Sequence, residues 1–135
     1  MRILCYCLMQ QTVQAVVIPP TVDSLAGFLT RAQTAFALRS TLCAPIAPAQ
    51  IWTAIRYVEC KPVREGWVLR AEDYSWSSAA AHLWSVDMRR ILDMEWWWQE
   101  SRGLDWHSYL DSFREDEEEL QISCDSGVRA LPATA

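Results

Sequence analysis

The chain has 135 residues and a formal net charge of −5, and 51% of its residues are hydrophobic. This length suits one small domain with a single core, and the eight tryptophans argue against a disordered chain. The charge is uneven: residues 1–70 carry seven bases against three acids, a net +4, whereas residues 71–135 carry five arginines against fourteen acids, a net −9. An acidic total weakens nucleic-acid binding, so any such contact is expected in the first half.

The first segment, residues 3–18, is apolar and uncharged, and it ends at Pro19 and Pro20. It predicts one long buried strand, or two shorter strands that meet near Gln10 and Gln11. Because glutamines interrupt the apolar run, neither a signal peptide nor a membrane span is expected, and we expect a cytoplasmic protein.

A helix is predicted after the prolines. Asp23 or Ser24 can cap it, apolar residues recur at helical spacing behind them, and it is expected to end near Arg39. Residues 40–50 contain two prolines and no periodicity, so they predict a loop.

A second helix is predicted from Pro48 to Cys60, since proline suits a first helical turn. Pro62 is expected to stop it, because the residue before a proline is pushed out of the helical region. This helix carries Tyr57, the one candidate nucleophile with a chemical context. Lys61 lies one turn beyond it and can offset a phenolate or hold a phosphate. The alternative is an ordinary helix residue with a half-buried ring.

The C-terminal half predicts shorter helices over 76–83 and 88–100, and a last one capped by Asp105. Three consecutive tryptophans, 96–98, cannot all face one core, so at least one is expected to be exposed. An unbroken acidic run begins at Glu115. We therefore expect one domain over residues 1–115 and an acidic, poorly ordered tail over 116–135.

The stretch RYVECKPVREGWVLRAEDYSWSSAAAHL, residues 56–83, resembles the Arg-Tyr-Val-Glu-x-Asn-Pro-Val-Arg-Ala-Gly-Leu-Val … Tyr-x-Trp-Ser-Ser segment of the REP-associated tyrosine transposases. The resemblance implies a ferredoxin-like antiparallel sheet and DNA transposition. It also implies that Tyr57 is the nucleophile, which attacks the DNA backbone and forms a 5′-phosphotyrosine link. Upstream, CLMQQTVQAVVIPP is similar to the family's Cys-Leu-Met-Pro-Asn-His-Val-His-Leu strand.

The chain departs from this family where a divalent metal, Mg²⁺ or Mn²⁺, would bind. The His-hydrophobic-His pair is replaced by Thr12-Val13-Gln14, and the family's asparagine four residues after the tyrosine is Lys61. A lysine ammonium repels a cation, and the two neutral residues are poor substitutes for imidazole ligands. We therefore expect no metal and no cofactor, and an idle Tyr57.

Taken with the resemblance, the sequence predicts a truncated, diverged α+β copy: a sheet remnant with four or five helices and a helix-dominated C-terminal half. The expected partner is hairpin or single-stranded DNA, bound weakly, and no membrane is expected to bind. The expected DNA contacts are Arg56, Lys61, Arg64 and Arg70. The alternative is a non-enzymatic helical remnant or protein-interaction module without DNA affinity, which self-associates through exposed tryptophan.

Overall fold

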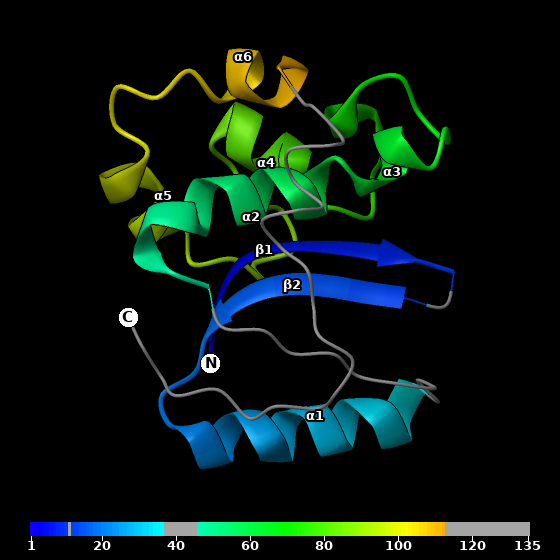
Figure 1. The fold of residues 1–135 in the computed structure, drawn as a ribbon, viewed down its shortest axis with the longest axis vertical. Coiled ribbons are helices and arrows are strands. Elements are labelled where there is room, and N and C mark those ends of the chain that lie inside the picture. The colour runs from blue at the N-terminus through cyan, green and yellow to red at the C-terminus, as the bar shows by residue number, and fades with distance from the viewer. Residues whose placement is uncertain (11, 37–45, 113–135) are drawn as a thin grey trace.

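The computed structural model of the chain describes residues 1–10, 12–36 and 46–112. Within these ranges a two-stranded antiparallel sheet is combined with six α-helices, which confirms a small α+β fold (Figure 1). The elements in chain order are β1 (Arg2–Met9), β2 (Thr12–Ile18), α1 (Val22–Phe36), η1 (Pro48–Gln50), α2 (Ile51–Glu59), α3 (Lys61–Arg64), η2 (Ala71–Asp73), α4 (Ala79–Trp84), α5 (Met94–Glu100) and α6 (Trp106–Asp111). The expected boundary at 115 and the tail 116–135 lie outside the described residues.

The uncharged N-terminal segment forms two strands rather than one. β1 and β2 pair as a hairpin in which Met9 lies opposite Thr12 and Cys7 lies opposite Gln14. Because side chains alternate between the two faces of a strand, Cys7, Gln14 and Thr12 share one face of the sheet.

The edge of β1 that faces away from β2 is hydrogen-bonded to the backbone of loop residues. Leu8 donates its N–H to the carbonyl oxygen of Trp76 at 2.8 Å, and the N–H of Ser78 donates to Tyr6 at 3.0 Å. The backbone of Asp93 makes a further bond near the start of β1. Residues 76–78 thus act as a short additional strand, which explains why the helix expected over 76–83 begins only at residue 79.

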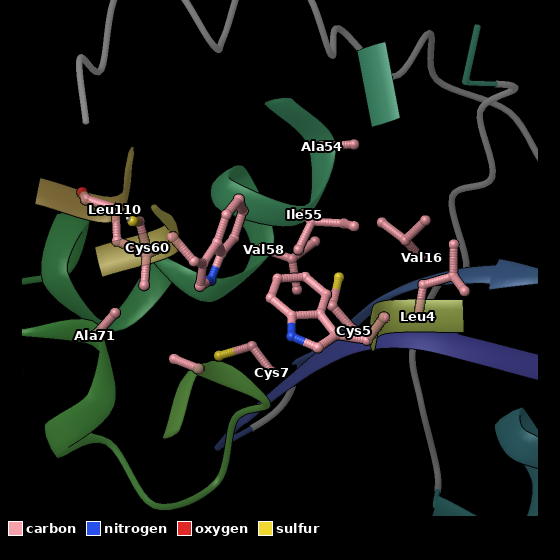
Figure 2. Packing of buried hydrophobic residues seen from close by; sticks show 13 residues of the cluster. Leu4, Cys5, Cys7, Val16, Ala54, Ile55, Val58, Cys60, Ala71 and Leu110 are labelled. Carbon is pink, nitrogen blue, oxygen red and sulfur yellow. Dashed lines mark hydrogen bonds between the residues drawn. The ribbon is translucent and has the colours of Figure 1, made fainter. Parts of the chain in front are cut away.

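Helix α2 covers one face of the hairpin and contains the centre of the core. Its residues Ile55 and Val58 point toward Cys5 of β1 and Val16 of β2 (Figure 2). Burial of such apolar side chains supplies roughly 1.5–3 kcal/mol each. The helix therefore has a fixed position on the sheet, and its C-terminal turn lies over the same sheet face as Gln14.

The start of α1 and the region around Pro62 differ from the sequence prediction. Helix α1 is capped by Thr21, whose hydroxyl accepts the N–H of Ser24 at 3.1 Å, rather than by Asp23 or Ser24. The chain does leave helix α2 before Pro62, as expected, but it immediately forms the single turn α3, which has Pro62 in its first turn. Proline is compatible there because the first helical N–H groups need no intrahelical partner.

Helix α5 begins at Met94, so the prediction of a helix from residue 88 was wrong. The carboxylate of Asp87 accepts backbone N–H groups from Ile91 and Leu92, at 2.6 and 2.7 Å, and Arg90 has a φ of 55°. These interactions hold a turn instead of a helix. Asp93 then caps α5.

The pKa of Asp93 is lowered by its cap interactions. The largest cause is the backbone N–H of Trp96, and the next is the side chain of Arg2. Arg2 Nε lies 2.6 Å from the Asp93 carboxylate, so the cap also ties α5 to the first residue of β1.

The three consecutive tryptophans, residues 96–98, divide between core and solvent as expected. Trp97 is 3% exposed and belongs to the core, whereas Trp98 is 52% exposed. Trp52 of α2 stacks on Trp96 and meets Trp97 edge-on, with ring centres 5.5 and 5.7 Å apart. These rings attach α5 to α2 and confirm that one of the three tryptophans is exposed.

Candidate functional site

The expected nucleophile, Tyr57, lies half-buried in the last turns of α2. Helix α2 ends at Glu59 and α3 begins at Lys61, and Arg64 of α3 lies over Tyr57, with the guanidinium carbon 3.8 Å from the centre of the tyrosine ring. Arg64 also donates to the Tyr57 carbonyl oxygen. The tyrosine and an arginine predicted to contact DNA are therefore in direct contact.

Lys61 lies next to this pair, at the start of α3. Its side chain is 17% exposed, and its ammonium is 3.5 Å from the carboxylate of Glu65, one turn later. Lys61 and Arg64 are also close enough to β1 to act on Cys7. Burial raises the pKa of the Cys7 thiol to about 11, and attraction from Lys61 and then Arg64 partly opposes that rise.

Cys7 links the two cations to the strand that resembles the family's metal strand. It pairs directly with Gln14, and Thr12 follows two residues later on the same face, exposed at the hairpin end. Arg64 of α3 lies over Tyr57 of α2, and Lys61 begins α3. Gln14 and Thr12 lie on the sheet face that α2 covers, and the hairpin register places Gln14 opposite Cys7.

This donor set does not fit Mg²⁺ or Mn²⁺. The Oε1 atom of Gln14 is buried and has no hydrogen-bond partner in the described structure, so it offers one neutral oxygen. Hard divalent cations need several oxygen ligands, usually including a carboxylate, and a lysine at the third position repels them. Across residues 1–10, 12–36 and 46–112, no three or more His, Cys, Asp or Glu side chains are placed to hold a metal together.

Arg56 does not belong to this surface. It is only 8% exposed, and its guanidinium lies 4.1 Å from the centre of the Tyr109 ring. It donates to the Tyr109 carbonyl oxygen at 3.3 Å and to the Ser112 hydroxyl at 3.1 Å. Arg56 therefore joins α2 to α6, and its expected role as a DNA contact stays a prediction.

Arg70 is exposed, just before η2. It lines a hollow of about 200 Å³ together with Cys60, Val63 and Asp111. Of the four arginines and lysines expected to contact DNA, Lys61, Arg64 and Arg70 remain outside the core.

A buried polar network beside the tyrosine helix was not anticipated from the sequence. Glu59 is fully buried and accepts hydrogen bonds from the Ser78 hydroxyl at 2.6 Å and the Trp106 indole N–H at 2.9 Å. It also contacts Nδ1 of His82, and the His82 ring stacks on Trp97 with centres 3.6 Å apart. One carboxylate thus connects α2 with α4 and α6.

A sequence signal for this network did exist. Glu59 lies four residues after the buried Ile55, so it places a charge on the apolar side of α2. Glu59 and Ser78 also both belong to the stretch that resembles the transposase segment. All of the bonding groups are closed to solvent, which makes the network structural rather than a binding site.

Comparisons of the chain with protein-family models, with curated proteins and with solved structures give no match. No helix in the described ranges is long and apolar enough to cross a membrane.

Proposed function

We propose that this chain binds DNA, hairpin or single-stranded, without cleaving it, as a diverged relative of the REP-associated tyrosine transposases. The observation that carries the proposal is the position of Arg64 over Tyr57, with the guanidinium carbon 3.8 Å from the ring centre, and of Lys61 at the start of the same short helix, α3. Lys61 also occupies the sequence position of the third metal ligand that the resemblance implies, so a positive charge replaces a ligand there.

Such a site can hold a phosphate without activating it. A guanidinium presents several N–H donors to phosphate oxygens, and an ammonium adds a compact charge. Attack by a tyrosine on phosphorus also needs electrophilic help at the phosphate, which a divalent metal supplies. Since Thr12, Gln14 and Lys61 do not suit such a metal, binding is separated from cleavage. Arg70, which is exposed just before η2, is the third cation proposed to contact DNA.

A salt-dependent titration tests this proposal. Fluorescence anisotropy is measured for a DNA hairpin with a single-stranded flank, using the parent protein and the Lys61→Ala and Arg70→Ala variants. Each substitution should weaken binding and flatten the plot of log K against log salt by roughly 0.7–0.9, the contribution of one phosphate contact. Arg102→Ala is the matched control, because Arg102 is an exposed arginine in the turn after α5 and is not among the predicted DNA contacts.

The cleavage half of the proposal has its own readout. The same DNA is incubated with the protein and Mn²⁺, denatured, and examined for a covalent adduct at Tyr57. No adduct is expected. A metal-dependent adduct would contradict the non-cleaving assignment, and binding that is equally weakened by Arg102→Ala would contradict the assigned surface.

A second candidate function, protein binding, is favoured by exposed apolar residues at the end of α4, in the loop that follows and on α5. These residues are Trp84, Val86, Met88, Ile91 and Trp98. Val86, Trp98 and Arg90 line a hollow of about 380 Å³. Aromatic residues, methionine and arginine are enriched in protein interfaces, so this Trp84–Trp98 surface suits a protein partner if DNA binding is not found.

A further inference from the structure

Trp67 lies in the short loop between α3 and η2, and the end of α3 fixes its backbone position. Gly66 has a φ of 74°, a conformation that favours glycine, and its N–H donates to the carbonyl oxygen of Val63 at 3.1 Å. The N–H of Trp67 donates to the carbonyl oxygen of Pro62 at 2.9 Å. These two bonds form a Schellman motif, which sets where the chain leaves the helix. Trp67 therefore has a fixed position relative to α3, the helix that carries two of the three proposed DNA contacts.

The ring of Trp67 is supported by a second aromatic residue and remains half-exposed. It meets the ring of Tyr74 at an angle of 68°, with the ring centres 6.0 Å apart. The Tyr74 hydroxyl donates to the carbonyl oxygen of Leu8 at 2.5 Å, so this support is anchored to β1. Trp67 nevertheless keeps 50% of its surface exposed. A large aromatic ring is thus presented to solvent from a backbone that is held in place.

Positively charged residues flank Trp67 along the chain. Arg64 precedes it by three residues and Arg70 follows it by three, and both are among the proposed DNA contacts. The acid between them is Glu65, whose carboxylate lies 3.5 Å from the ammonium of Lys61. The transposase segment that this stretch resembles has leucine at the position of Trp67, so the resemblance does not account for the exposed ring.

We propose that the Trp67 ring stacks on an unpaired base of the bound DNA, so that this chain prefers single-stranded DNA to fully paired DNA. The inference rests on the DNA-binding function proposed above and narrows its partner. Inside a duplex, neighbouring bases cover both faces of each base, whereas an unpaired base has a face free for an aromatic side chain. Aromatic stacking combined with cations along the backbone binds single strands with little sequence preference. Trp67 supplies the stacking surface, and the flanking arginines supply the charge.

Anisotropy titrations of the full chain with two probes test the preference. One probe is a single strand of thymidines, and the other is a fully paired duplex of the same length. The parent protein should bind the single strand more tightly. Trp67→Leu, which keeps an apolar side chain without a ring, should weaken that binding roughly 5- to 150-fold and leave duplex binding within about twofold. Trp67→Phe should keep most of the affinity for the single strand, because it keeps a ring.

Trp84→Leu is the matched control, because Trp84 is 71% exposed at the end of α4 and lies outside the Arg64–Arg70 segment. This variant should bind both probes as the parent protein does. Circular dichroism of the Trp67 variants should be unchanged, since the ring is half-exposed. If Lys61→Ala weakens binding and Trp67→Leu does not, the stacking inference is overturned and the DNA-binding function stands. A parent protein that binds neither probe overturns both.

Photo-cross-linking locates the contact in the parent protein. The single-stranded probe carries one iodouracil, irradiation links this base to an aromatic ring that lies against it, and the tryptic peptides are identified by mass spectrometry. Trypsin cleaves after Arg64 and Arg70, so the peptide 65–70 contains Trp67 as its one aromatic residue. The cross-link is expected in this peptide. A cross-link confined to the peptides that contain Trp84 or Trp98 would overturn the proposal.

Discussion

Replacement of Glu59 by alanine should be among the most destabilising single changes in this chain. The substitution removes the acceptor for the Ser78 hydroxyl and the Trp106 indole, and it removes the contact with Nδ1 of His82. A buried donor left without a partner costs roughly 1–3 kcal/mol, and removing one member of a buried charged network costs about 3–5 kcal/mol in total. That loss is comparable to the whole stability of a small domain, about 5–15 kcal/mol.

The assay is urea unfolding followed by tryptophan fluorescence and circular dichroism. Glu59→Gln keeps the side-chain volume and one acceptor oxygen, and it should lose about 1–3 kcal/mol, so it remains measurable if the alanine variant is unfolded. Glu65→Ala is the control, since Glu65 is half-exposed and its pairing with Lys61 should contribute at most about 1 kcal/mol. A free energy of unfolding for Glu59→Ala within about 1 kcal/mol of the parent protein would refute the reasoning.

Three further predictions concern packing, capping and the arginines. Trp97→Ala should lose about 3–5 kcal/mol in urea unfolding, whereas Trp98→Ala should stay within about 0.5 kcal/mol, because only the first ring is buried. Asp93→Asn should lower stability at pH 7, and the loss should shrink as pH falls below 3.8: a depressed carboxyl pKa stabilises above the unfolded value of 3.8, and the effect is lost as pH falls through the folded pKa. Arg56→Ala should lower the thermal midpoint, and Arg70→Ala should leave it unchanged and instead weaken DNA binding.

The local parts of the fold follow from the sequence. The uncharged run before Pro19 predicts strands, Asp105 predicts the cap of α6, and its carboxylate accepts the N–H of Ser108 at 3.3 Å. The division of residues 96–98 between core and solvent follows from helical geometry alone. Each of these predictions depends on neighbours within one or two turns, which the sequence states directly.

Helix boundaries were less predictable where a side chain competes with the helix. The residues after Asp87 have helical propensity, yet its carboxylate accepts their N–H groups and holds a turn. Likewise, residues 76–78 pair with β1 instead of starting α4. In both places an interaction of a few residues overrides a weak local preference.

The sequence by itself determined the extended character of residues 3–18, the amphipathic tyrosine helix and the loss of imidazoles at positions 12 and 14, and the resemblance implied the α+β class. Only the tertiary structure decided which charges are accessible. Arg56 and Arg64 are eight residues apart with the same side chain, yet one is buried against Tyr109 and the other lies over Tyr57. Glu59 and Glu65 also have the same side chain, yet Glu59 is buried and Glu65 is half-exposed. Which charged side chains are buried, and which partners they have, depends on contacts between segments that are distant in sequence, here the contacts of β1, α4 and α6 with α2. The local sequence pattern carries no information about these contacts.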